Sequence, residues 1–276
     1  MKKDLYLGMR PGDLDGKRYA KFWNPNMETM QEHVLRALNH GVEAPELGFP
    51  VEEANQLLEP GYLALENGFT RLPNGQIFVA VLTKMPGVTS EMIDWWMGWH
   101  YLETQRYKLW HPRAHIANRA ERMISDDAGY TDREKYLGNP NYVTEYVGND
   151  CVDITIAFAP ASDYLDVSRF EAARIGTVLC GVVSPQNAPV SAAILMHAIR
   201  ETDDGCEMKS RFWLGRVEVT GLPGAGLLNK ITRSPFVAKR VFPIEAGRDM
   251  VVHCGMEMNH LASFLPALYA EYHPSA

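Results

Sequence analysis

The sequence predicts an α+β fold in which a curved antiparallel sheet is covered by a long C-terminal helix. Five β-rich segments follow one another from Tyr142 onward. The turn signals GND at 148–150 and DDG at 203–205 separate several of them, which indicates antiparallel neighbours. Apolar residues at helical spacing between Ala246 and Tyr272 predict one helix long enough to lie across the concave face of the sheet.

The first 60 residues are expected to form a small helical region. Apolar residues recur at helical spacing between Asn26 and His40, and a glycine follows them, which predicts an amphipathic helix. A second, short helix is expected from about Val51 to the breaker at residues 59–61. The chain is therefore divided into an N-terminal region, residues 1–60, and a larger domain, residues 61–276.

The larger domain is expected to open with a hairpin and an aromatic-rich helix. Two β-rich segments flank the turn PNG at 73–75, which is a strong hairpin signal. Thr89 or Ser90 then caps a helix that ends near the residue before Pro112. Residues 224–234 form a short helix or a loop between the last strand and the C-terminal helix.

Charge and composition exclude several classes of protein. The formal net charge of −7, with no compensating run of Lys or Arg, removes the positive surface that nucleic-acid binding needs. No run of about 18 apolar residues and no signal-peptide core is visible, so no membrane partner is expected and the predicted compartment is cytoplasmic. The 4 cysteines lack a CxxC spacing, which indicates reduced thiols. A metal would therefore be held by nitrogen and oxygen.

The C-terminal helix carries polar residues where a core is expected. His253 and Glu257 lie about one helical turn apart, so both can reach one metal ion. A solvated pair on the helix surface is the alternative interpretation. His260 lies on nearly the same face and is either a rival ligand or part of a cavity wall. A long helix over a curved sheet leaves such a cavity beneath it.

Other residues can complete a coordination sphere. Glu145 shares one side of its strand with Val143 and Val147, so strict alternation points it inward, where a carboxylate needs a partner. His115 lies, with His111, where the aromatic helix breaks. A metal ion bound by two imidazoles and two carboxylates would neutralise the charge of the buried carboxylates. That set consists of His115, Glu145, His253 and Glu257.

Four stretches of the chain together carry a resemblance to a known family. They are YKLWHPRAHIAN at 107–118, TEYVGND at 144–150, AILMHAIRET at 193–202 and VVHCGME at 251–257. In their order and spacing they resemble the bacterial zinc-dependent 2,4-diacetylphloroglucinol hydrolases and phloretin hydrolases, from about residue 60 onward. That family cleaves the carbon–carbon bond between a polyphenol ring and its acyl group, so the implied substrate is a small aromatic ketone.

The resemblance implies a fold and a cofactor. The fold would be a helix-grip domain like those of pollen allergens and START proteins, preceded by a small N-terminal domain that contributes to a homodimer. One zinc ion per chain would be bound by the two histidines and two glutamates given above.

The resemblance also implies residues that contact substrate. Tyr107 and Asn118 would hold the ring hydroxyls, and His197 would be the pocket histidine that carries out proton transfers. Phe212 stands where a second pocket tyrosine is expected, which removes one phenolic hydrogen bond.

Two alternatives stay open at the level of sequence. The chain could be a non-catalytic helix-grip protein that binds an aromatic or lipid ligand, and the tryptophans of residues 95–110 fit that function equally well. A zinc ion with a purely structural role is the other alternative, because four protein ligands resemble a closed site.

Overall fold

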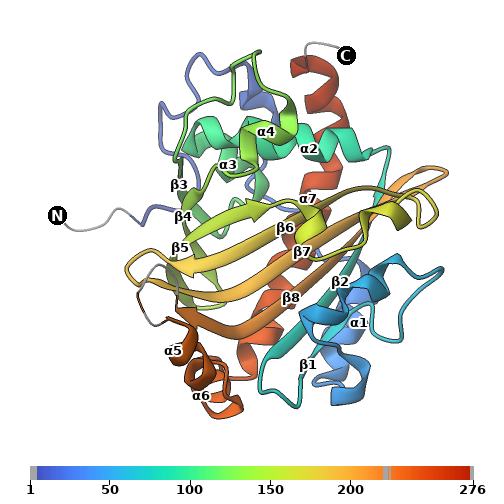
Figure 1. Ribbon diagram of the computed structural model, residues 1–276. Helices are drawn as coiled ribbons and strands as arrows, with labels where there is room; N and C mark the ends of the chain where they lie inside the picture. Colours follow the sequence, from blue (N-terminus) through green and yellow to red (C-terminus); the bar gives the residue numbers. More distant parts are fainter. Residues whose placement is uncertain (1–4, 220–222, 224, 274–276) are drawn as a thin grey trace.

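An eight-stranded antiparallel sheet and a long C-terminal helix dominate the structure (Figure 1), a computed structural model that describes residues 5–219, 223 and 225–273. The hydrogen-bonded strands follow the order β1-β2-β8-β7-β6-β5-β4-β3. Helix α7 (Glu245–Tyr272) runs along one face of the sheet and packs closely on β2. The predicted α+β helix-grip class is confirmed.

All neighbouring strands in the sheet are antiparallel. The strands are β1 (Gly68–Arg71), β2 (Ile77–Pro86), β3 (His115–Ala120), β4 (Asn141–Val147), β5 (Asp150–Ala159), β6 (Ile175–Pro185), β7 (Val190–Thr202) and β8 (Gly205–Val219). The five β-rich segments predicted after Tyr142 are β4 to β8, and the predicted hairpin is β1–β2. At its turn Gly75 adopts φ 87°, a backbone conformation that favours glycine.

Helices and 3₁₀ turns connect and cover the sheet. They are η1 (Arg18–Phe22), α1 (Glu32–His40), η2 (Pro45–Leu47), η3 (Val51–Leu58), α2 (Ser90–Trp99), η4 (His100–Leu102), α3 (Thr104–Trp110), α4 (Asp132–Tyr136), η5 (Ala161–Asp163), η6 (Val167–Arg169), α5 (Ala225–Thr232) and α6 (Pro235–Val241). Residues 225–232 of the segment left open as helix or loop are therefore helical. Its first residue, at 224, and the end of the last predicted β-rich segment, at 220–222 and 224, lie outside the described residues.

The sheet has an apolar layer on each face. Along β8, Phe212 and Leu214 pack in the cluster that contains α7, whereas Trp213 between them packs on the opposite face. There Trp213 donates its indole N–H to the carbonyl of Phe49 at 2.7 Å. Residues 49–58 cover this outer face, so the inner face is left to α7 and to the cavity beneath it.

The first predicted helix begins later than expected. Residues 26–40 were expected to be helical throughout, but α1 begins only at Glu32. Gln31 instead binds the edge of β2: its side-chain amide donates to the carbonyl of Lys84 at 2.8 Å and accepts from its backbone N–H at 3.0 Å. Tertiary hydrogen bonds thus replace a helical turn that the apolar spacing predicts.

The predicted aromatic helix is divided in two. Of the two predicted caps, Thr89 is the one that caps α2, by accepting from the backbone N–H of Met92. Glu103 then adopts extended angles, φ −154° and ψ 152°, and separates α2 and η4 from α3. Its carboxylate accepts from Lys17 at 2.5 Å and from Tyr19 at 2.6 Å. At this break, the hydrogen bonds of Glu103 therefore connect the N-terminal region to the main domain.

Two further details differ from the sequence-based expectation. The second N-terminal helix is 3₁₀ rather than α, and it is interrupted at Glu53, where φ is −104° and ψ is 15°. The short strand β3 and the helix α6 were not predicted at all. Within the described residues, no helix is both long enough and apolar enough to cross a membrane.

Candidate metal centre and cavity

A cavity of about 390 Å³ lies between the sheet and α7. Most of its wall is apolar, with Ile154 and Leu195 as typical members. Among the polar side chains of this wall, three belong to two elements that are far apart in the sequence. They are Glu145 on β4, and His253 and Glu257 on α7. The inward direction of Glu145 predicted from strand alternation matches this position.

Two histidines point the same ring nitrogen toward one place. His115, at the start of β3, has its Nδ1 2.9 Å from the carbonyl of Tyr107, and His253 has its Nδ1 3.1 Å from the carbonyl of Tyr146. A carbonyl only accepts hydrogen bonds, so each Nδ1 carries a ring proton, and in a neutral imidazole the lone pair is then on Nε2. Backbone carbonyls orient metal-binding histidines in this way.

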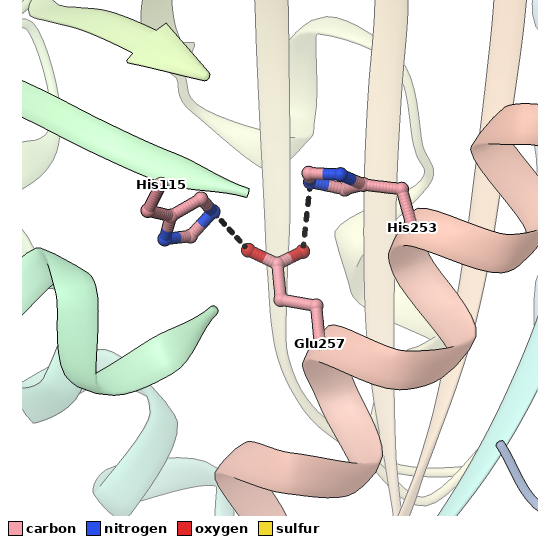
Figure 2. Close-up of side chains that lie close together, drawn as sticks. All are labelled: His115, His253 and Glu257. Carbon is pink, nitrogen blue, oxygen red and sulfur yellow. Dashed lines mark ion pairs between the residues drawn. The ribbon is translucent and has the colours of Figure 1, made fainter. Parts of the chain in front are cut away.

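Glu257 lies between these two nitrogens (Figure 2). Its Oε1 is 3.1 Å from His115 Nε2, and its Oε2 is 3.9 Å from His253 Nε2. His115 Nε2 is buried and makes no hydrogen bond to any described residue. One ligand atom from each of the three residues lies within 4.8 Å of the others, which is a spacing that one metal ion can bridge.

Glu145 lies beside this group of three. Its two carboxylate oxygens are 3.7 Å from His115 Nε2 and 4.0 Å from His253 Nε2. It pairs with His115 across β3 and β4, so the sheet register fixes their proximity. The structure therefore brings all four predicted ligands to one end of β4, with three of them in the tighter group.

The charge of this cluster favours a bound cation. Glu145 and Glu257 are both 7% exposed, and among the described residues neither forms an ion pair with Lys or Arg. Two buried carboxylates without a cation are costly. A divalent ion with two carboxylate and two neutral imidazole ligands would be electrically balanced. The donor set and its orientation therefore fit a metal ion that prefers nitrogen and oxygen ligands.

Tyr107 is buried against the cluster. Its ring stacks on His115, with centroids 3.7 Å apart and planes at 4°, and its hydroxyl donates a hydrogen bond to Glu145 Oε2. Burial and the neighbouring carboxylate raise the pKa of Tyr107 well above its usual value, so the phenol keeps its proton as a donor. The hydroxyl assigned to substrate by resemblance thus binds Glu145 in this structure.

Two predicted site residues do not line the cavity: His115, which belongs to the cluster, and Asn118. The side-chain amide of Asn118 donates to the carbonyl of His100 at 3.2 Å, and its backbone N–H donates to the Thr104 hydroxyl at 3.3 Å. These bonds tie β3 to η4 and α3. His260 also lies apart, because its Nδ1 accepts from the backbone N–H of Glu28.

His197 and Phe212 face the cavity from neighbouring strands. Their ring centroids are 5.6 Å apart at an interplanar angle of 81°. Burial lowers the pKa of His197 to about 4, so its ring is neutral at pH 7. Its Nδ1 lies 2.7 Å from the hydroxyl of Ser210, which leaves the other ring nitrogen for the cavity.

Sequence reasoning assigned no role to several residues of this region, among them Asn141 and His111. Asn141 lines the cavity four positions before Glu145, and strand alternation from Glu145 could have identified it. His111 stacks on His253 with ring centroids 4.8 Å apart, and burial lowers the pKa of His111, with the neighbouring histidines adding to the shift. His111 was noticed beside His115, but its contact with α7 depends on tertiary structure.

Comparison with known families agrees with this geometry. The family model described as "DAPG hydrolase PhiG domain" matches residues 49–270. The chain belongs to this family. The resemblance drawn from four stretches of the sequence is confirmed, and so is the prediction that the chain is a hydrolase.

Relatives in the family extend over almost the whole chain. The 2,4-diacetylphloroglucinol hydrolase of Pseudomonas protegens is 32% identical over 264 residues, which cover 93% of this chain and 85% of that protein. The phloretin hydrolase of Eubacterium ramulus is 30% identical over 258 residues, which cover 92% of this chain and 89% of that protein.

Two solved structures are similar to this chain with low scores. The crystal structure of Ara h 8.0201 has a TM-score of 0.31 and 9% identity, and it covers 64% of this chain and 99% of its own. Norcoclaurine synthase from Thalictrum flavum, solved with dopamine and hydroxybenzaldehyde, has a TM-score of 0.31 and 12% identity. The match covers 65% of this chain and 89% of the synthase chain.

Proposed function

We propose that this protein hydrolyses the carbon–carbon bond between a phloroglucinol-type ring and its acyl group, with one zinc ion per chain. Its relatives named for 2,4-diacetylphloroglucinol and for phloretin support the substrate class. The observation that carries the proposal is the oriented pair of histidine Nε2 atoms beside Glu257 in an apolar cavity. Apolar walls fit an aromatic ketone, whereas the polar cluster supplies the reactive end.

The proposed zinc ligands are those predicted from the sequence. They are His115, Glu145, His253 and Glu257. A zinc ion held there would act as a Lewis acid toward an acyl oxygen and would lower the pKa of water. The protein holds the ligands in place before the ion binds, because both imidazoles are already oriented by backbone carbonyls.

His197 is proposed to move the protons of the reaction. As a neutral base it accepts a proton from the water whose oxygen bonds to the acyl carbon. As the ring–acyl bond breaks, the bonding electron pair stays with the ring carbon, and His197 returns the proton to that carbon. The products are the deacylated phenol and a carboxylic acid, so one water molecule is consumed and no redox partner is needed.

Substrate orientation is proposed to depend on Tyr107, with Asn118 retained as a proposed contact. Tyr107 already donates to Glu145, so a ring hydroxyl would have to share or replace this bond. Phe212 offers only its apolar ring beside His197, so this part of the wall would bind an apolar portion of the acyl group.

A ligand-binding protein without chemistry is the second candidate function. The apolar cavity, which Trp110 lines, favours it, since such a cavity requires no metal, whereas the stacked Trp95 and Trp99 belong to the core and do not line the cavity. In such a protein both histidines could pair with the carboxylates as imidazolium ions. In that state the carboxylate oxygen next to His115 Nε2 would be Glu257 Oε1, at 3.1 Å.

Turnover of two acylphloroglucinols tests the proposal. We expect the zinc-loaded protein to convert phloretin or 2,4-diacetylphloroglucinol to a deacylated phloroglucinol and the matching carboxylic acid, identified by mass spectrometry. In ¹⁸O-labelled water, one labelled oxygen should enter the acid. Saturable binding of both compounds without any acid product would support the non-catalytic alternative instead.

We also propose that residues 1–60 form an N-terminal region through which two chains pair in the cytoplasm. Large apolar side chains are exposed there, including Leu5, Tyr6 and Val42, which is 55% exposed. Light scattering should give twice the mass of one chain, and a monomer at micromolar concentration would contradict the pairing.

A further inference from the structure

Helices α5 and α6 lie together at one end of β8 and pack on it with polar and small side chains (Figure 1). The side-chain amide of Asn229 in α5 accepts from the backbone N–H of Val219 at 2.6 Å and donates to its carbonyl at 3.2 Å. Ala238 of α6 is buried close to Gly215 of β8. These contacts leave the large apolar side chains of both helices free to face outward.

Five large apolar side chains of α5 and α6 are indeed exposed. Phe236 is 75% exposed and Leu227 is 70% exposed. The other three are Leu228, Ile231 and Val241. A helix on the surface of a globular protein normally turns such residues toward the core, so the usual arrangement is reversed here. Apolar groups gathered on a surface in this way are typical of a site that contacts a partner or a membrane.

The same segment is positively charged, although the chain as a whole is negative. Residues 225–243 contain no Asp or Glu, and their four cationic side chains are exposed: Lys230, Arg233, Lys239 and Arg240. Arg233 pairs with Glu218 at 2.9 Å, whereas the other three form no ion pair with any described residue. Since the formal net charge of the chain is −7, these cations stand out against an acidic remainder.

Charge and apolar surface together decide which occupant fits. A second copy of the chain, docked symmetrically through these helices, would bring the same four cations together, which is unfavourable. A bilayer with anionic headgroups offers negative charge and an apolar interior at the same place. The expectation of no membrane partner rested on the lack of a spanning segment, and contact with a membrane surface does not require one.

We propose that the α5–α6 surface, made of the five apolar side chains and four cations named above, binds anionic lipid membranes. The cations contact lipid phosphates, and Phe236 and Leu227 enter the boundary between headgroups and acyl chains. One consequence rests on the proposed function. Phe242, directly after α6, lines the cavity, so a docked chain holds its cavity beside a bilayer in which an apolar aromatic ketone collects.

Sedimentation of the full chain with lipid vesicles tests the docking without any substrate. We expect binding to vesicles of phosphatidylglycerol mixed with phosphatidylcholine, weaker binding as salt is raised, and little binding to phosphatidylcholine alone. Lys239→Gln combined with Arg240→Gln should weaken binding about thirtyfold, because each cation near an anionic surface contributes about fivefold. Lys84→Gln combined with Arg122→Gln is the matched control, since it removes two exposed cations elsewhere and should bind like the wild type.

A second pair of variants tests the apolar contribution. Phe236→Ser combined with Leu227→Ser should weaken binding by more than about tenfold, because less apolar surface leaves water. Met123→Ser combined with Val167→Ser is the control, since these side chains are exposed elsewhere, at 58% and 48%. Circular dichroism confirms that each variant remains folded.

Three results decide between the possible occupants. A wild type that does not bind anionic vesicles, or that binds them as strongly after both α5–α6 changes, would overturn the proposal. Unchanged vesicle binding with a lower mass by light scattering in the Phe236→Ser, Leu227→Ser protein would assign this surface to a second copy instead. Vesicle binding that follows the expected pattern in a protein without hydrolase activity would support the docking and reject only the proposed function.

Discussion

Tyr107 shows how one residue can support a metal site without binding the metal. Its hydroxyl donates to Glu145 and its ring lies flat on His115, so it contacts two of the proposed ligands. Both contacts restrict the ligands to one orientation before the ion binds. Outer contacts of this kind contribute strongly to metal affinity.

Replacing Tyr107 with Phe should therefore weaken zinc binding. The variant keeps the stacked ring but leaves Glu145 without its donor, and we expect about a tenfold to hundredfold loss of zinc affinity. Competition with a zinc chelator of known affinity measures the change. Tyr142→Phe is the matched control, because the Tyr142 hydroxyl binds Glu121 at the surface, away from the cluster. Equal zinc affinity in Tyr107→Phe and the wild type would contradict the assigned role.

The direction of a side chain could be predicted where it follows from the periodicity of a single helix or strand. The spacing of His253 and Glu257 on a helix, and the inward direction of Glu145 on a strand, follow from local periodicity. The contacts of Asn118 and His111 depend on how α3, β3 and α7 pack together, and local sequence periodicity does not predict that packing. The ligand roles themselves stay predictions.

Among the helices, α7 matters most because it must lie close to the sheet. Gly247 makes this approach easier: a Cβ at this position would lie 2.8 Å from side-chain atoms of Ile77 and Phe69. Both neighbours are buried in the inner core and have little room to move.

Gly247→Ala should therefore destabilise the protein although alanine favours helices. Overpacking of this kind costs about 1 to 3 kcal/mol in the free energy of unfolding. Gly226→Ala in α5 is the matched control, since nothing lies within 4 Å of its added Cβ, and it should be neutral or stabilising by up to about 1 kcal/mol. Urea unfolding measures both variants. A Gly247→Ala protein as stable as the control would show that α7 can shift at no cost.

Element-level prediction succeeded for long periodic segments. The helix expected over 246–272 and the five β-rich segments after Tyr142 are observed with nearly the expected bounds. Short elements were missed or changed when distant groups supplied their hydrogen bonds. The first turn of the helix predicted over 26–40 is replaced by the bonds of Gln31 to Lys84, and the break at Glu103 depends on partners in the N-terminal region.

At the scale of the whole molecule, the fold places a neutral histidine in its interior. Burial lowers the pKa of His197 to about 4 in the folded chain, whereas an unfolded histidine titrates near 6.5. Between these values the unfolded state binds the proton and the folded state does not. The contribution of His197 to stability is therefore complete above pH 6.5 and is lost as the pH falls toward 4.

Acid should thus destabilise the wild type more steeply than His197→Gln. The expected difference in slope is about 1.2 kcal/mol per pH unit between pH 6 and pH 4.5. Urea unfolding at several pH values, with a chelator in every buffer so that metal does not contribute, measures this slope. His40→Gln changes an exposed histidine and serves as the control. Parallel slopes for the wild type and His197→Gln would contradict the interior titration.

The outer layer of the molecule also bears on domain organisation. Residues 49–58 pack on the sheet face opposite α7, and the family model begins at residue 49. We still propose that residues 1–60 form the region through which two chains pair. These ten residues contribute to the core of the main domain as well, which a pattern of helices alone does not reveal.

We propose that the cluster on β3, β4 and α7 holds a catalytic metal ion. Metal content of the purified protein, determined by inductively coupled plasma mass spectrometry with phloretin turnover in parallel, tests it most directly. We predict about one zinc per chain in the wild type and in His260→Ala, and loss of both zinc and turnover in His115→Ala. A folded wild-type protein that contains no metal, and that added zinc does not activate, would show that these side chains only line a ligand cavity.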